Sequence, residues 1–187
     1  MRIISGTNRG RKLTPPVSLP VRPTTDFAKE GLFNLLANLI DFDKISVLDI
    51  FSGTGNIAYE FASRGSKSIT AVDQNKACAK YITDTAEKIG FKNLDVFNRD
   101  AFSFLKTTPK TYDLIFADPP YDMENTENIH EIVFERKLLN KNGLLVIEHS
   151  AAKHFAYLDH FLQVRNYGSV HFSFFKCEDK ETQSEQE

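Results

Sequence analysis

The chain has 187 residues, of which 41% are hydrophobic, and these values fit one compact domain with a sizeable core. Two cysteines far apart in the sequence, and no apolar run of the ~18–20 residues that cross a bilayer, exclude a disulfide scaffold and a membrane-spanning protein, so we expect a cytoplasmic location without a membrane partner. The net charge of −2 is unevenly distributed, because residues 1–22 contain five basic side chains and no acidic one, whereas the remaining residues carry −7.

Residues 1–22 predict a basic N-terminal arm with a stiff linker. Residues 1–14 indicate a β-hairpin, with short strands at 3–4 and 12–13 around turn-forming residues at 5–10. Prolines at positions 15, 16 and 20 form the linker. A basic arm favours a polyanionic partner, whereas the plainer interpretation is a solvated positive tail. We expect the arm to be exposed and to bury little apolar surface.

From residue 24 onward the pattern alternates between helices and strands. Thr24, Thr25 and Asp26 are good N-caps, and apolar residues at 28, 32, 35, 36 and 39 predict one face of a helix that reaches about residue 40. Further along, short apolar runs alternate with segments that place apolar residues on one helical face. We expect strands at 45–50, 68–72, 94–97, 112–117, 144–148, 163–167 and 170–176, and further helices at 56–64, 76–89, 125–139 and 151–161.

This alternation predicts an α/β fold with a doubly wound, mostly parallel, seven-stranded Rossmann-like sheet. Gly168 separates the last two strands, which therefore form an antiparallel hairpin. The predicted domain covers residues 23–177, after the arm and linker of residues 1–22. Residues 178–187 are acidic and polar, and we expect them to be a disordered tail.

A glycine-rich loop, DIFSGTG, follows the first strand of the predicted sheet. Gly53 and Gly55 allow the backbone to turn sharply and to approach a ligand closely. The spacing also fits the dinucleotide fingerprint of an oxidoreductase. However, Asp49 places a carboxylate at the mouth of this loop, where it repels a pyrophosphate and favours a cation such as the amino or sulfonium group of S-adenosylmethionine.

Acidic residues at the ends of the next two predicted strands extend this site. Asp73 stands where an acid holds ribose hydroxyls, and Asp100 is placed for an adenine amino group. Each could instead cap a loop, but acids at the ends of three successive strands favour a ligand site. We assign to the cofactor Asp49, Phe51, Gly53, Gly55, Asp73, Asp100 and Ala101.

The sequence Asp118-Pro119-Pro120-Tyr121 follows the predicted strand 112–117. Two prolines hold the backbone extended just beyond the carboxyl end of a strand, where open α/β sheets bind ligands. The Asp118 carboxylate and the Pro119 carbonyl can each accept one N–H of an exocyclic amino group, and Tyr121 can stack on the base. The alternative is a proline-stiffened turn with a capping Asp. We assign catalysis to Asp118, Pro119 and Tyr121 and expect no metal, because the five histidines lack paired ligand spacing.

These residues resemble the RsmD family of small-subunit (16S) ribosomal RNA guanine-N2 methyltransferases, which methylate the 2-amino group of guanine. The resemblance covers residues 1 to about 176, and MRIISGTNRGRKL, RPT at 22–24, DIFSGTG, DPPY and YGSVHFSFFK carry it. It implies a class I methyltransferase fold, S-adenosylmethionine as cofactor, and ribosomal RNA or an assembling small ribosomal subunit as partner. The chain departs from the family at Ala58, where relatives commonly have a third glycine. We expect a monomer.

Other functions are compatible with parts of the pattern. DPPY also occurs in methyltransferases that act on adenine, so a DNA or RNA adenine 6-amino methyltransferase is the main alternative. A non-catalytic RNA-binding module would leave DPPY without a purpose, and Asp49 disfavours an oxidoreductase. We assign contacts with substrate RNA to Arg2, Arg9, Arg11, Lys12, Arg22 and Thr24.

Overall fold

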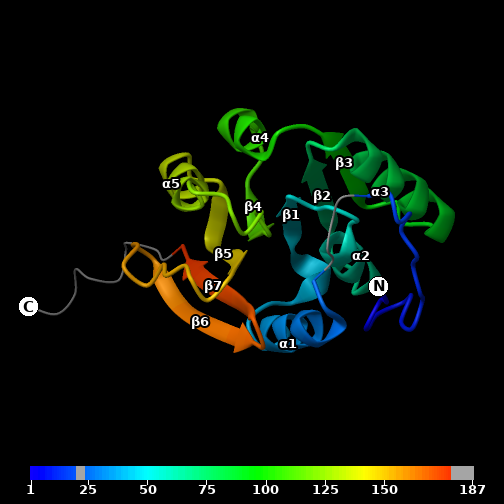
Figure 1. The fold of residues 1–187 in the computed structure, drawn as a ribbon, viewed down its shortest axis with the longest axis horizontal. Coiled ribbons are helices and arrows are strands. Elements are labelled where there is room, and N and C mark those ends of the chain that lie inside the picture. Colours follow the sequence, from blue (N-terminus) through cyan, green and yellow to red (C-terminus); the bar gives the residue numbers. More distant parts are fainter. Residues whose placement is uncertain (20–23, 178–187) are drawn as a thin grey trace, which may run out of the picture.

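A seven-stranded sheet forms the centre of the molecule, and the computed structural model describes residues 1–19 and 24–177. The strands are β1 (Ser46–Ile50), β2 (Ser68–Asp73), β3 (Leu94–Asn98), β4 (Tyr112–Ala117), β5 (Leu139–His149), β6 (Phe161–Tyr167) and β7 (Val170–Lys176). Their order in the sheet is β3-β2-β1-β4-β5-β7-β6 (Figure 1). β1 to β5 run parallel, whereas β7 is antiparallel to both β5 and β6. The predicted mostly parallel sheet with a terminal hairpin is confirmed.

Helices cover both faces of this sheet, as a doubly wound fold requires (Figure 1). The side chains of β1 alternate between the two faces. Val47 packs into a core with the first three helices, and Leu48 packs into a second core with the last two. The helices are α1 (Asp26–Leu36), α2 (Asn56–Ser63), α3 (Lys76–Ile89), α4 (Ala101–Thr107) and α5 (Glu127–Glu135), with a short 3-10 helix at Phe42–Lys44.

Three helices of the structure, α1, α4 and α5, differ from the predictions. α4 was not predicted, although Asp100 caps it by accepting a hydrogen bond from the backbone N–H of Ser103 at 2.8 Å. α1 ends at Leu36 rather than near residue 40, because the backbone tightens there into three-residue turns. α5 also ends early, at Glu135, since Lys137 takes a left-handed conformation (φ 53°) and β5 begins only two residues later.

The helix predicted at 151–161 is wrong. Residues 151–160 form turns, such as the one closed by the Leu158 N–H to the Phe155 carbonyl at 3.1 Å, and β6 begins at residue 161. Phe155 is 2% exposed and its ring meets the His149 ring edge-on, with centroids 4.8 Å apart. Burial of this one side chain holds the connection close to the sheet and outweighs the helical pattern.

Residues 1–13 fold back on themselves and lie against α2. One antiparallel bridge, between Arg2 and Lys12, joins the two sides of this segment, so the predicted hairpin arm is not confirmed. Ile3 is 2% exposed and belongs to the core shared by α1 and α2. The expectation that this segment buries little apolar surface is therefore wrong. Arg22 and the tail predicted to be disordered, residues 178–187, lie outside the described residues.

A buried polar network attaches the N-terminal segment to α1 and α2. The Glu60 carboxylate on α2 accepts the backbone N–H groups of Ile4 at 2.8 Å and of Ser5 at 3.0 Å. Lys29 of α1, 1% exposed, donates to the Arg2 carbonyl at 2.6 Å and lies 3.8 Å from Glu60. Each buried charge thus has a partner, which a stable interior requires.

Candidate active site

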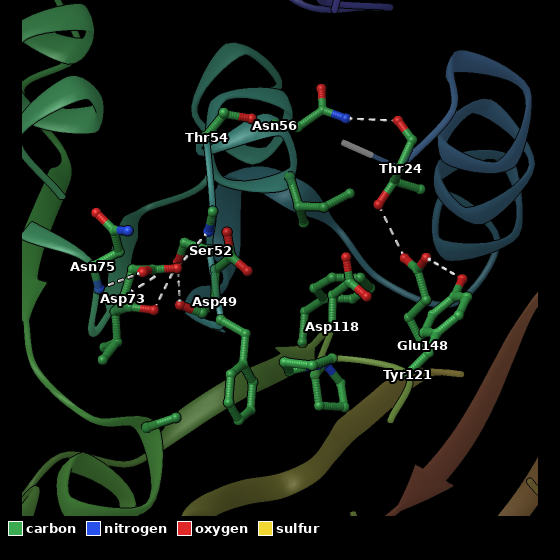
Figure 2. A pocket seen from close by; sticks show the side chains of 18 of the residues that line it. Thr24, Asp49, Ser52, Thr54, Asn56, Asp73, Asn75, Asp118, Tyr121 and Glu148 are labelled. Carbon is green, nitrogen blue, oxygen red and sulfur yellow. Dashed lines mark hydrogen bonds between the residues drawn. The ribbon is translucent and has the colours of Figure 1, made fainter. Parts of the chain in front are cut away.

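A pocket of about 470 Å³ opens at the carboxyl ends of the central strands. Its walls come from the loop after β1, the end of β2, the residues after β4, the end of β5 and the residues just before α1 (Figure 2). β1 and β4 are neighbours in the sheet although they are distant in the sequence. The pocket therefore lies at the topological switch point, where open α/β sheets bind their ligands.

The loop after β1 is held in a conformation that suits close approach to a ligand. Phe51, Gly53 and Gly55 all have positive φ angles, of 60°, 55° and 78°. A Cβ at Gly55 would come within 2.8 Å of the Tyr59 ring, so a larger residue fits there neither sterically nor conformationally. Ser52 fastens the loop to β2, because its hydroxyl accepts the N–H of Val72 at 3.0 Å. Phe51 and Gly53 line the pocket.

Asp49 is a buried carboxyl group that faces this pocket. It is 1% exposed, and its Oδ2 atom has no hydrogen-bond partner within the described part of the chain. Burial raises the pKa of Asp49 to about 8, and the charge of Asp73 adds to this shift, although hydrogen bonds from Ser52 and the Ala58 backbone act against it. A buried carboxyl oxygen without a partner can accept a donor or cation from a ligand, and the assignment of Asp49 to the cofactor stays a prediction.

Asp73 connects two loops at the rim of the pocket. Its Oδ2 accepts the backbone N–H of Gly53 at 2.8 Å, and its Oδ1 accepts that of Asn75 at the same distance (Figure 2). A carboxylate has about four acceptor positions, so two remain for ligand hydroxyl groups. Asp73 therefore shapes the glycine-rich loop and still has acceptor positions left at the pocket.

The other residues assigned to the cofactor are distributed differently. Ala101, the first residue of α4, lines the pocket. Asp100 is exposed, uses its carboxylate to cap α4, and is not part of the pocket wall. Gly55 also lies behind the wall, where its role is to begin α2 in the left-handed conformation.

Residues 118–121 form the side of the pocket opposite Asp73. Asp118, Pro119 and Tyr121 all line it, and Tyr121 is 46% exposed. Burial raises the pKa of Asp118 well above its usual value, and the neighbouring Glu148 and Asp49 carboxyl groups raise it further. The predicted acceptor and stacking groups thus lie together in the structure.

Glu148 is a site residue that the sequence reasoning missed. It ends the apolar part of β5, is 3% exposed, and lines the pocket beside Asp118. Its Oε2 accepts the Thr24 hydroxyl at 3.0 Å and its Oε1 accepts the Tyr121 hydroxyl at 3.2 Å (Figure 2). Burial raises the pKa of Glu148 to about 7, against the effect of these two hydrogen bonds. An acid at the end of the fifth predicted strand, 144–148, was the available signal.

Four of the basic residues assigned to RNA, Arg2, Arg9, Arg11 and Lys12, lie in the described part of the chain and do not line this pocket. Arg2 and Lys12 line an open groove of about 690 Å³ that shares Thr24 with the first pocket. Arg9 and Arg11 are exposed at the turn of the N-terminal segment and line neither cavity. Thr24 is buried, and its hydroxyl group donates to Glu148 instead of facing the surface.

A search of residues 1–19 and 24–177 finds no cluster of three or more His, Cys, Asp or Glu side chains that could hold a metal ion. None of the helices in these ranges has the length and apolar character needed to cross a membrane.

Comparison with known proteins finds relatives that are named as ribosomal RNA methyltransferases. A family model described as Conserved hypothetical protein 95 matches residues 1–176. The Ribosomal RNA small subunit methyltransferase D of Haemophilus influenzae is 33% identical over 152 residues, covering 79% of this chain and 78% of that protein. The Escherichia coli protein of the same name is 32% identical over 79% of this chain and 74% of its own length. The Putative rRNA methyltransferase YlbH of Bacillus subtilis is 31% identical over 80% and 82%.

Solved structures agree with the fold. A structure titled "Putative methyltransferase yhhF from Escherichia coli" superposes with a TM-score of 0.83 at 27% identity, covering 96% of this chain and 99% of that one. A putative methylase from Haemophilus influenzae gives a TM-score of 0.78 at 27% identity, covering 95% and 98%. The α/β sheet described above is therefore the class I methyltransferase architecture.

Proposed function

Because the chain belongs to the RsmD family, whose model is described as Conserved hypothetical protein 95, we propose that it methylates the 2-amino group of a guanine in small-subunit ribosomal RNA. The methyl donor is S-adenosylmethionine, which supplies a methyl group activated by a sulfonium centre. The observation that carries this proposal is that residues 118–121 line the same pocket as the Asp49 carboxyl group, whose Oδ2 atom has no partner among the described residues.

The donor side of the pocket fits a cofactor with a positive charge and a ribose. Asp49 would hold the cationic group, because its Oδ2 atom lacks a partner in the described structure. Asp73 would bind hydroxyl groups with the acceptor positions that Gly53 and Asn75 leave free. Phe51 and Ala101 supply apolar wall for a flat ring.

The acceptor side of the pocket orients an amino group. The lone pair of guanine's 2-amino nitrogen is delocalised into the ring, which makes this nitrogen a poor nucleophile. Hydrogen bonds from its two N–H groups to the Asp118 carboxylate and the Pro119 carbonyl favour a pyramidal nitrogen whose lone pair points outward. Tyr121 stacks on the base and fixes its plane. Positioning supplies most of the rate enhancement.

Proton removal follows methyl transfer. The amino nitrogen becomes strongly acidic only once it carries the new methyl group, so no strong base is needed before attack. Asp118 lies at the transfer point, and its raised pKa makes the carboxylate a better proton acceptor than an ordinary Asp.

Methyl transfer from labelled S-adenosylmethionine tests the proposal directly. The protein is incubated with small ribosomal subunits, and separately with their RNA, and the RNA is then digested to nucleosides. We expect the label in N2-methylguanosine. Label in N6-methyladenosine would instead support the adenine methyltransferase, since an Asp-Pro-Pro-Tyr step can receive either amino group.

A further inference from the structure

Asp118 and Pro119 cannot by themselves distinguish guanine from adenine. Both bases offer an exocyclic amino group with two N–H donors to these two acceptors. The bases differ at the ring nitrogen N1, next to the carbon that carries the amino group. N1 of guanine carries a hydrogen and is a donor, whereas N1 of adenine carries a lone pair and is an acceptor. A second acceptor beside Asp118 would therefore suit guanine and repel adenine.

Glu148 provides an acceptor at that place. β4 and β5 pair in parallel, with Ala117 opposite Ile147. The residue after Ala117 is Asp118 and the residue after Ile147 is Glu148, so this register brings Asp118 and Glu148 side by side. Figure 2 shows the two carboxyl groups next to each other in the wall of the pocket. They are close enough for the charge of Glu148 to act on Asp118.

The surroundings of Glu148 fix its carboxyl group as an acceptor. The hydroxyl groups of Thr24 and Tyr121 donate to one oxygen each, which leaves each oxygen a further acceptor position. Thr24 is itself fixed, because Asn56 of α2 donates to its carbonyl at 2.9 Å. The site is therefore built from three separate parts of the chain around this one side chain, and α1 supports it through Lys29, which donates to Asn56 at 2.7 Å.

We propose that Glu148 is a specificity-determining residue that accepts the N1–H of the guanine whose 2-amino group lies against Asp118. When adenine enters, the same carboxylate faces the lone pair on N1, and the repulsion between the two excludes adenine. This inference rests on the proposed function, because it presupposes guanine as the base. It assigns to Thr24 the role of a positioning residue that holds the Glu148 carboxyl group.

The substitution Glu148→Gln tests the inference with two substrates. One is the small-subunit RNA with guanine at the methylated position, and the other carries 2-aminopurine there. 2-Aminopurine keeps the 2-amino group but has a lone pair at N1, so it cannot donate to Glu148. Gln keeps the size of Glu and adds an amide N–H that can donate to that lone pair. We expect E148Q to lower the guanine to 2-aminopurine rate ratio by at least about tenfold.

The variant Tyr121→Phe is the matched control. It keeps the aromatic ring and removes the hydroxyl group that donates to Glu148. In Y121F the Thr24 hydroxyl still donates to Glu148 and holds its carboxyl group. If Glu148 acts on the base, Y121F therefore lowers both rates by a similar factor and leaves the ratio near the wild-type value. If Glu148 only positioned Tyr121, Y121F would change the ratio as much as E148Q does, and the inference would be overturned. Because 2-aminopurine also lacks the guanine O6 atom, only ratios between variants are compared.

Folding and the base assignment are controlled separately. Cofactor affinity and melting temperature are measured for each variant, and if E148Q is too unstable to assay, Glu148→Asp replaces it. E148D withdraws the acceptor from N1–H, so the guanine rate falls while the 2-aminopurine rate does not. A guanine to 2-aminopurine ratio unchanged from wild type in the folded variant overturns the inference while the proposed function stands. Methylation of adenine by the wild type would overturn the proposed function itself.

Discussion

Four carboxyl groups lie at or just beyond the carboxyl ends of strands β1, β2, β4 and β5, around one pocket: Asp49, Asp73, Asp118 and Glu148. Burial raises the pKa of three of them, Asp49, Asp118 and Glu148, which means that the folded protein holds protons that an unfolded chain would release. Such an arrangement lowers stability near neutral pH. Its retention is understandable if ligand cations and N–H donors satisfy these groups during function.

Asp118→Ala tests the acceptor role of this residue. Removing the carboxylate deletes one of the two acceptors for the amino group, so we expect methyl transfer to fall by about a hundredfold or more. Cofactor affinity, measured by calorimetry, should stay within a few-fold of wild type. Asp122→Ala is the control, because Asp122 is exposed and lies outside the pocket. Lost cofactor binding together with normal residual turnover would place Asp118 in the cofactor site.

Asp49→Asn tests the buried carboxyl through pH. Since the pKa of Asp49 rises from 3.8 to about 8 on folding, its stabilising contribution is complete below pH 3.8 and is lost as the pH rises toward about 8. The slope from one such group is at most about 1.4 kcal/mol per pH unit. Asn carries no proton to release, so D49N should gain stability over wild type as the pH rises from 5 to 8.

Urea unfolding at several pH values measures this difference. Asn at this position also lacks the charge that binds a cation, so the affinity of D49N for the cofactor at pH 8 should fall by tenfold or more. D49N should therefore lose cofactor affinity at the pH at which it gains stability. A stability difference between D49N and wild type that is constant with pH would show that Asp49 is ionised in the free protein.

The sequence pattern placed three of these four acids, Asp49, Asp73 and Asp118, in a ligand site, but it did not identify Glu148. Asp49, Asp73 and Asp118 follow apolar runs, and parallel strands bring their carboxyl ends to one edge. The two hydrogen bonds of Glu148 join it to residues 124 and 27 positions away, and no local pattern encodes them. Asp100 follows the same local pattern, yet its carboxylate caps α4, because a backbone N–H three residues on competes for it.

At the scale of elements, the strands were predicted better than the connections between them. Apolar runs identify buried strands because both faces of a parallel sheet are covered. The connection at residues 151–160 resembles a helix in its pattern, but burial of Phe155 decides its structure. The short helix α4 was hidden because its cap, Asp100, fitted the ligand pattern as well. At residues 151–160, tertiary packing overrides the local helical preference. At α4, the sequence pattern fits a helix cap and a ligand site equally well.

The N-terminal segment is an integral part of the core, and Ile3→Ala tests this. Ile3 is 2% exposed and packs with residues of α1 and α2, so its truncation leaves a cavity. We expect the free energy of unfolding to fall by about 2–5 kcal/mol, and by only about 0.5–1.5 kcal/mol for the control Ile3→Val. Both are measured by urea unfolding. Equal stability of the three proteins would mean that the segment is not packed on the core in solution.

At the scale of the whole molecule, charge is separated between the N-terminal segment and the rest. The first 22 residues carry five basic side chains within a protein of net charge −2. The buried contacts of Ile3 and Glu60 hold residues 1–13, which include four of these five side chains, in a fixed position beside the groove that adjoins the active-site pocket. A fixed basic surface next to an acidic pocket can bind the RNA backbone while the pocket receives a base.

The combined substitution of Arg9, Arg11 and Lys12 by Ala tests this division of roles. All three side chains are exposed, so the melting temperature and cofactor affinity should be unchanged. If they bind phosphates, RNA affinity falls by similar factors across sequences, and the removal of each phosphate-binding side chain reduces the salt slope of single-stranded or looped RNA by about 0.7. Filter binding at several salt concentrations measures both quantities.

The matched control removes the same charge elsewhere, from the exposed residues Lys88, Lys92 and Lys106. A slope that changes equally in both triple variants would reflect net charge alone, and an unchanged slope in the first would leave these residues as a solvated surface.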